Sequence, residues 1–295
     1  MILRALGALA RRVVRLLHAL HLVWIARAVV NRLPPRLRLW LSRLQVRLGY
    51  MDGLTLVPEA ALQRSFEDAL RLLRPAGPTA PATAAPAVYL EFGVYVGTSL
   101  ACMARAADRS GPGAPARAVR IIGFDSFEGM PAGDPAERRP GLGSGQLYSD
   151  VALTRANLRR LGVAAARVEL VPGWFEASLT DATRTRLSLR SVDVVMIDCV
   201  IESATRSALD FILPLVTDRT VIFFDDWSVF DFEERDLGEK AAFEGWAAAH
   251  PELAVERLPG LEYNSDARAF LLARTAQPAA ARRRSAARPA LGAPA

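Results

Sequence analysis

Residues 88–99 read VYLEFGVYVGTS, an apolar run that leads into a glycine-rich turn. The run Val88–Phe92 is short and rich in β-branched and aromatic residues, which is typical of a buried strand. Gly93 and Gly97 allow a tight turn and a close approach of a ligand to the backbone, and the helix expected next offers unpaired N–H groups. The spacing is not G-x-G-x-x-G, and Glu91 stands beside the turn. This favours a ligand with a cationic or hydroxyl-rich part over a pyrophosphate.

Short apolar runs alternate with helical segments through the rest of the body of the chain. Strands are expected at Val88–Phe92, Val119–Phe124, Val168–Val171, Val192–Ile197 and Thr220–Phe224. Helices are expected at Pro58–Leu73, Ser99–Asp108, Val151–Leu161, Ser203–Leu213 and Leu237–Ala249. The runs Leu253–Leu258 and Ala267–Ala273 are expected to form an antiparallel edge pair. This order predicts an α/β fold with a doubly wound, mostly parallel, Rossmann-like sheet, in which ligands bind beyond the carboxyl ends of the strands.

Acidic residues follow three of these strands. Asp125 ends the second strand, where a carboxylate can accept hydrogen bonds from both hydroxyls of a ribose; a turn or helix N-cap is the alternative role. Asp198 ends the fourth strand, and Asp225 and Asp226 end the fifth. Adjacent strand ends bring these three carboxylates together, and their mutual repulsion predicts a Mg²⁺-type site. Solvent-exposed turn residues are the alternative.

Five segments carry a resemblance to a known family. They are EFGVYVGTS (91–99), GFDSFEGMP (123–131), LVPGWFEASL (170–179), MIDCVIESAT (196–205) and IFFDDW (222–227). In this order and spacing they resemble the macrocin O-methyltransferase (TylF-like) family of class I S-adenosylmethionine-dependent methyltransferases. The resemblance implies a Rossmann-like methyltransferase sheet with an N-terminal helical extension. It also implies methyl transfer from S-adenosyl-L-methionine to a hydroxyl of a sugar or glycosylated natural product, with help from a divalent metal.

The resemblance further implies roles for individual residues. The residues that would bind S-adenosyl-L-methionine are Glu91, Gly93, Tyr95, Gly97, Thr98, Ser99, Asp125, Ser126, Gly173, Trp174, Phe175 and Asp198. Those that would bind Mg²⁺ are Asp198, Asp225 and Asp226, and the candidate catalytic residues are Asp198, Glu202 and Asp226. The expected partner is a small-molecule glycoside or sugar acceptor.

One departure from the family concerns the end of the fourth strand. Relatives commonly read D-x-D-L-Y there, whereas residues 198–202 read DCVIE, so Val200 replaces the second aspartate and Glu202 replaces the tyrosine. Metal binding is therefore weakened or relies on Glu202. The departure keeps an alternative open, namely a catalytically impaired methyltransferase-like binding domain in a glycan or natural-product assembly pathway. A Rossmann dehydrogenase is disfavoured because G-x-G-x-x-G is missing.

Charge divides the chain into a basic arm, an acidic body and a basic tail. Residues 1–51 hold ten arginines and no acid, and residues 276–295 hold four arginines and no acid. Since the whole chain carries +6, residues 52–275 carry −8, which argues against a nucleic-acid groove in the body. The expected parts are N-terminal amphipathic and cap helices (1–74), a Pro/Ala linker (75–87), the methyltransferase domain (88–275) and a disordered basic tail (276–295).

The basic arm is expected to form an amphipathic helix to about residue 30 and a second helix at 36–48. Two roles are open: the helices cap the domain or make a homodimer contact, or residues 1–33 lie on an anionic membrane surface. The longest charge-free run there, 16–26, is 11 residues long, whereas a membrane span needs about 20 apolar residues. With only two cysteines and no disulfide framework, a cytoplasmic location is expected, with membrane-surface association as the alternative.

Overall fold

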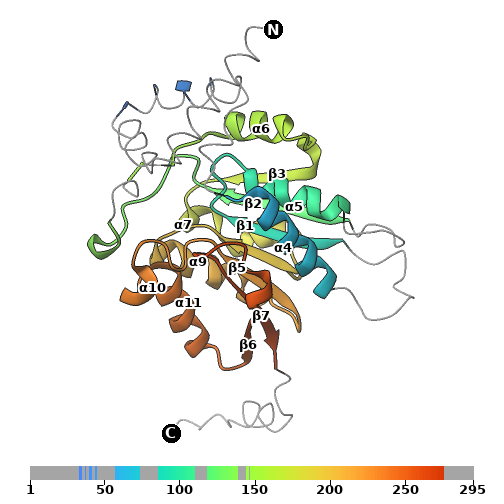
Figure 1. Cartoon of the computed structure of the whole chain (residues 1–295), viewed down its shortest axis with the longest axis vertical. Coiled ribbons are helices and arrows are strands. Elements are labelled where there is room, and N and C mark those ends of the chain that lie inside the picture. The colour runs from blue at the N-terminus through green and yellow to red at the C-terminus, as the bar shows by residue number, and fades with distance from the viewer. Residues whose placement is uncertain are drawn as a thin grey trace, which may run out of the picture.

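The computed structural model describes residues 33, 34, 37, 40, 41, 44, 57–73, 86–109, 118–138, 144–145 and 147–275 (Figure 1). The predictions for the two helices of the basic arm, its membrane or dimer contact, most of the linker and the tail lie almost entirely outside these residues. Across the described ranges, no helix combines the length and the apolar character needed to cross a bilayer.

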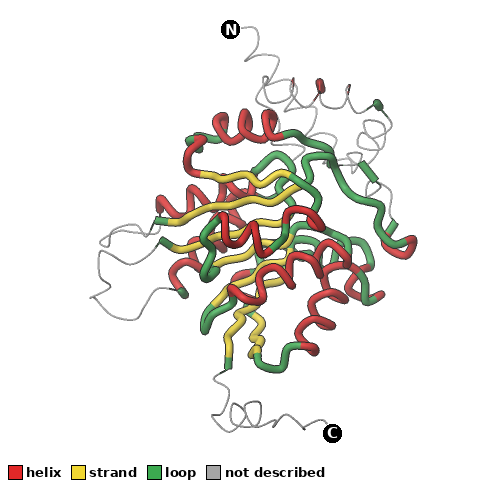
Figure 2. Tube along the Cα trace, turned by 180° about the vertical axis from the view of Figure 1, so that it is seen from behind, coloured by secondary structure: helices red, strands yellow, loops and turns green. Residues whose placement is uncertain are grey.

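A seven-stranded sheet in the order β3-β2-β1-β4-β5-β7-β6 forms the centre of the fold (Figures 1 and 2). The strands are β1 (Ala87–Phe92), β2 (Val119–Asp125), β3 (Val168–Pro172), β4 (Val194–Ile197), β5 (Thr220–Phe224), β6 (Leu253–Arg257) and β7 (Arg268–Arg274). Strands β1 to β5 pair in parallel, and β7 runs antiparallel to both β5 and β6. The predicted mostly parallel sheet and its antiparallel edge pair are confirmed.

Helices cover both faces of the sheet (Figure 2). The long helices are α4 (Glu59–Leu72), α5 (Thr98–Arg109), α6 (Val151–Arg160), α9 (Glu202–Ile212) and α11 (Gly238–Ala249). The short helices α7 (Phe175–Ser178), α8 (Asp181–Arg186) and α10 (Phe232–Arg235) were not predicted, because one turn shows no periodic pattern. Successive strand residues point to opposite faces, so Tyr89 packs with α4 and α5 whereas Leu90 and Phe92 pack with α9 and α11.

Helix α4 shares the core of the sheet, although the Pro/Ala segment separates the two in sequence. Leu62 and Phe66 are fully buried in the same cluster as the strand residues. The ring of Phe66 meets Tyr89 of β1 edge-on at 5.4 Å and Phe223 of β5 at 5.3 Å between centroids. This helix therefore packs across β1 and β5, the two strands on either side of β4, while the domain boundaries proposed from sequence stay predictions.

Replacing Phe66 with alanine tests this packing. Phe66→Ala removes a fully buried ring, and we expect it to lower the free energy of unfolding by about 3–5 kcal/mol. Equilibrium urea unfolding of the full chain measures the change. The control is Leu72→Ala on the same helix, where the side chain is 37% exposed and a loss of about 1 kcal/mol or less is expected. Equal losses in the two variants would contradict the packing role of Phe66.

Candidate active site

A hollow lies beyond the carboxyl ends of the parallel strands, where the sheet order places a ligand site. The order reverses between β1 and β4, and such a switch point leaves a crevice. The residues that line the hollow are Gly93, Val94, Tyr95, Asp125, Ser126, Gly129, Met130, Pro131, Ala132, Leu147, Trp174, Phe175, Glu176, Asp198, Cys199, Val200, Ser203 and Ala204. Seven of the residues predicted to bind the cofactor are among them. The other five, Glu91, Gly97, Thr98, Ser99 and Gly173, do not line it.

Gly93 brings the backbone of the turn after β1 against the end of β4. Its φ is +88°, and a Cβ atom there would lie 1.9 Å from the carbonyl oxygen of Asp198. The N–H of Gly93 donates to the carbonyl of Phe124 at 2.9 Å, which joins the same turn to β2. Only glycine meets both requirements, a left-handed conformation and a backbone-to-backbone approach. The turn that the sequence marked as decisive therefore fixes one wall of the hollow.

Asp125 closes the glycine turn with its carboxylate. One oxygen accepts the N–H groups of Val94 at 2.7 Å and Tyr95 at 2.9 Å, and the other accepts the N–H of Phe127 at 2.7 Å. This is the turn role that the sequence left as the alternative to ribose binding. Two carboxylate oxygens offer about four acceptor sites, and Asp125 lines the hollow, so its binding of a ribose hydroxyl stays a prediction.

Glu91 lies behind the turn and not in the hollow. Its carboxyl is completely buried and accepts hydrogen bonds from the hydroxyls of Ser99 and Tyr89, both at 2.6 Å. Burial raises the pKa of Glu91 to about 8, against the opposing effect of these two hydrogen bonds. Glu91 therefore braces β1 against the start of α5, and its support of the glycine turn is indirect.

The three strand-end aspartates come together as the sequence predicts. Asp198, Asp225 and Asp226 each offer one carboxylate oxygen, and these atoms all lie within 4.8 Å of one another. Burial raises the pKa of all three, with repulsion between the carboxylates adding to the shift of Asp198 and Asp226. The pKa of Asp225 rises to about 6, although a hydrogen bond from Tyr263 opposes the rise. Protons or a cation must neutralise such a cluster.

Two residues that contact this cluster were not predicted from the sequence. Glu239, fully buried in α11, accepts the N–H of Cys199 at 3.3 Å and the N–H of Asp226 at 2.9 Å, so it ties the ends of β4 and β5 together. Tyr263 donates its hydroxyl to Asp225. Glu239 stands in the first turn of a predicted helix, but nothing in the sequence distinguishes it from the neighbouring surface glutamates.

Glu202 does not join the three aspartates, although the sequence offered it as their replacement ligand or base. Its carboxylate pairs with Arg206 at 2.9 Å, and its backbone N–H donates to Glu137 at 2.7 Å. Glu202 lines a second hollow with Glu137 and Arg206. Val200, which replaces the family's second aspartate, has a φ of +65° and is buried against Met130 and Phe232. The loop after β4 therefore turns an apolar side chain towards the site.

The sheet order, the glycine turn and the strand-end acids are those expected of a class I S-adenosylmethionine-dependent methyltransferase fold. Residues 90–227 match the family model described as a methyltransferase domain, which identifies this part of the chain as a methyltransferase domain. The class inferred from the sequence resemblance is confirmed.

The chain is similar in sequence to one O-methyltransferase and in structure to two solved methyltransferases. The chain is 32% identical over 157 residues to 8-demethyl-8-(2,3-dimethoxy-alpha-L-rhamnosyl)-tetracenomycin-C 4'-O-methyltransferase from Streptomyces olivaceus, covering 51% of this chain and 57% of that protein. The structure superimposes on the O-methyltransferase NovP with a TM-score of 0.54 and 20% identity, covering 74% and 79% of the two chains. It superimposes on the calicheamicin methyltransferase CalS11 with a TM-score of 0.52 and 21% identity, covering 77% of this chain and 81% of that chain. These two structures confirm the fold.

Substitution of Gly93 tests the contact between β1 and β4. Gly93→Ala drives a Cβ atom against the carbonyl of Asp198, so we expect it to lower both stability and affinity for S-adenosylhomocysteine. The control is Gly162→Ala, since Gly162 has a similar φ of +83° but no atom within 4 Å of the added Cβ. The control should cost only the left-handed conformation, about 1–2 kcal/mol. Urea unfolding and titration calorimetry measure the two effects, and equal behaviour of both variants would refute the close contact.

The buried carboxyl of Glu91 should make the ligand-free chain less stable as the pH rises. Its pKa is about 8 in the folded chain against an ordinary 4.5, so between these values the folded chain holds a proton that the unfolded chain has released. The free energy of unfolding then falls with rising pH, by at most about 1.4 kcal/mol per pH unit for this group. Urea unfolding across this window should show a shallower slope for Glu91→Gln. Identical slopes in wild type and variant would show that Glu91 does not titrate there.

Proposed function

We propose that the chain transfers a methyl group from S-adenosylmethionine to a hydroxyl of a sugar or of a glycosylated natural product. The observation that carries this proposal is the convergence of Gly93, Asp125 and Asp198, from three different strand ends, on one hollow. The matched relative from Streptomyces olivaceus is named as an O-methyltransferase of a rhamnosyl tetracenomycin. Its name supports a sugar hydroxyl as the acceptor class.

The cofactor side of the hollow belongs to the ends of β1, β2 and β3. S-adenosylmethionine supplies a methyl group that is already activated on a sulfonium. The turn at Gly93 and Tyr95 would lie against its methionine part, Asp125 with Ser126 against its ribose, and Trp174 with Phe175 against its adenine, where flat rings stack. Glu91, Gly97, Thr98, Ser99 and Gly173 act from behind these residues in the proposal. They would stabilise the backbone of the residues that contact the cofactor.

Asp198, at the end of β4, forms the acid side of the hollow; Asp225 and Asp226, at the end of β5, cluster with it but do not line the hollow. An all-oxygen donor set whose pKa values are raised by burial and mutual repulsion suits a hard cation, and Asp198, Asp225 and Asp226 would hold Mg²⁺. Such an ion lowers the pKa of a bound hydroxyl. Because Val200 supplies no carboxylate, the site has no donor from the family's second position.

Asp198 is the candidate catalytic acid or base that lines the hollow. We assign to its carboxylate the proton of the acceptor hydroxyl, because Asp198 lines the hollow whereas Asp225 and Asp226 do not. Asp226 supports this role as a neighbouring carboxylate of the same cluster. Glu202 drops out of the proposed mechanism, since it faces Arg206 in the second hollow.

A second candidate function is favoured by Val200. A buried, β-branched residue in a left-handed conformation stands where relatives carry an acid. This observation favours a methyltransferase-like domain that binds the cofactor without efficient turnover. Cofactor affinity together with the absence of transfer distinguishes this candidate from the enzyme.

A transfer assay on the full chain tests the proposal. The probes are radiolabelled S-adenosylmethionine, Mg²⁺ and an aryl α-L-rhamnoside, and label is expected to move to the glycoside. Asp226→Asn should lower the rate by at least about tenfold through loss of a ligand and of support for Asp198. The matched control is Glu202→Gln, which should stay near wild type because Glu202 pairs with Arg206 and is not one of the three clustered carboxylates.

Other outcomes separate the parts of the proposal. Binding of S-adenosylhomocysteine without transfer to any of a panel of glycosides would favour the second candidate. Failure of the wild-type chain to bind S-adenosylhomocysteine would contradict both candidates. Full activity after treatment with EDTA would reject Mg²⁺ while leaving methyl transfer in place.

A further inference from the structure

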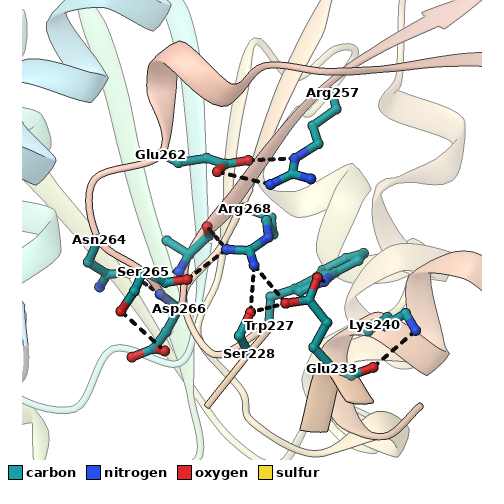
Figure 3. A network of polar contacts seen from close by, with 11 residues as sticks. Trp227, Ser228, Glu233, Lys240, Arg257, Glu262, Asn264, Ser265, Asp266 and Arg268 are labelled. Carbon is teal, nitrogen blue, oxygen red and sulfur yellow. Dashed lines mark hydrogen bonds and ion pairs between the residues drawn. The ribbon is translucent and has the colours of Figure 1, made fainter. Parts of the chain in front are cut away.

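A polar network joins the segment after β5 to the start of β7 (Figure 3). Arg268 is the first residue of β7 and pairs in register with Phe224, the last residue of β5. One guanidinium nitrogen donates to the hydroxyl of Ser228 at 2.7 Å and to the carboxylate of Glu233 at 2.6 Å. The other donates to the carbonyls of Ser265 and Ala267 at 2.7 and 2.9 Å. We call Arg268, Ser228 and Glu233 the Arg268 clamp.

Glu233 gathers three donors from this network. Its carboxylate accepts the indole N–H of Trp227 at 3.1 Å, the hydroxyl of Ser228 and the guanidinium of Arg268. The N–H of Ser228 donates in turn to the carbonyl of Asp266 at 3.1 Å. Residues 227–233 are therefore held at both ends against the start of β7 (Figure 3).

The guanidinium of the clamp is better shielded than that of the neighbouring ion pair. The side chains of Arg268 and Glu233 are 13% and 33% exposed, whereas those of Arg257, on β6, and its partner Glu262 are 50% and 14% exposed. Exposed ion pairs contribute little to structure because water competes for both partners, and truncating one partner of a shielded pair has larger effects. Arg257 donates to Glu262 at 2.8 and 3.1 Å, and Figure 3 draws no bond from it to Trp227, Ser228 or Glu233.

The clamped segment adjoins two of the strand-end aspartates and packs against residues that line the hollow. It follows Asp225 and Asp226 directly in the chain. Within it, Val229 and Phe232 pack in one cluster with Met130, Val200 and Ile201, and Met130 and Val200 line the hollow. The lining residues on the cofactor side come from the ends of β1, β2 and β3. Through Phe232 the clamped segment reaches Val200, after β4, and Met130, in the loop after β2.

We propose that the Arg268 clamp is a positioning device that sets the geometry of the strand-end carboxylates and of the apolar wall next to them. The inference rests on the proposed function, because it assigns the clamp a role in holding the divalent cation. Arg268 and Glu233 touch neither cofactor nor acceptor in this proposal, and they act through Asp225, Asp226 and Phe232. Loosening the clamp should therefore weaken cation binding and leave cofactor binding intact.

Two titrations on the full chain test the clamp. Mn²⁺ reports on the aspartates by electron paramagnetic resonance, and S-adenosylhomocysteine reports on the cofactor side by calorimetry. Arg268→Gln and Glu233→Gln should each weaken Mn²⁺ binding by about tenfold or more, with unchanged affinity for S-adenosylhomocysteine. Arg268→Lys keeps the charge but loses the planar fork, so its effect should be intermediate. The matched control, Arg257→Gln, should change neither titration.

The double variant Arg268→Gln with Glu233→Gln sharpens the test. If the two residues act as one device, the double variant should bind Mn²⁺ with the same affinity as whichever single variant has the lower affinity. Additive losses, unchanged Mn²⁺ affinity, or a parallel loss of S-adenosylhomocysteine binding would each overturn the inference while leaving the proposed function standing. A wild-type chain that binds S-adenosylhomocysteine but no Mn²⁺ would refute the metal site first, and the inference with it. If Arg268→Gln fails to fold, Glu233→Gln and Arg268→Lys decide the matter.

Discussion

The approach of the Gly93 backbone to the carbonyl of Asp198 is the constraint on which the site depends. It joins the turn after β1 to the end of β4 with no side chain between them. Gly93 and Asp198 both line the hollow, so the same contact fixes the spacing of two of its walls and, in the proposed function, the spacing of cofactor and acceptor. Alignment of reacting groups supplies much of the barrier reduction in group transfer, about 7–11 kcal/mol at best.

Charge imposes the second constraint, because the fold buries more carboxyl groups than it neutralises. Burial raises the pKa of Glu91, Asp198, Asp226 and Glu239 well above ordinary values, and no described basic side chain forms an ion pair with any of them. Backbone N–H groups and hydroxyls satisfy part of their hydrogen-bonding capacity. A ligand-free chain holds these groups at the expense of stability, which is common at sites that bind a cation or move a proton.

The sequence predicts the strands, their mostly parallel order and the convergence of Asp198, Asp225 and Asp226, since these follow from local pattern and from one rule about strand ends. It does not predict side-chain direction within the turns. The left-handed backbone at Val200 directs the chain so that Glu202 faces Arg206, away from the aspartates. Glu239 and Arg268 escape because their partners are set by tertiary packing: Glu239 meets Cys199 across 40 positions, and Arg268 meets Ser228 across 40.

The insertion of β7 between β5 and β6 has a consequence for how the protein is made. On the ribosome, β1 to β4 and the residues of the cofactor side emerge first, and domains tend to organise from the N-terminal end. Strand β5 pairs with β4 on one side, but its other edge stays unpaired until residues 268–274 have left the exit tunnel, because β7 lies between β5 and β6. Tyr263 and Arg268 are also among the last residues of the domain to be made. The nascent chain therefore exposes Asp225 and Asp226 without Tyr263 or Arg268 in place until translation of the domain is almost complete.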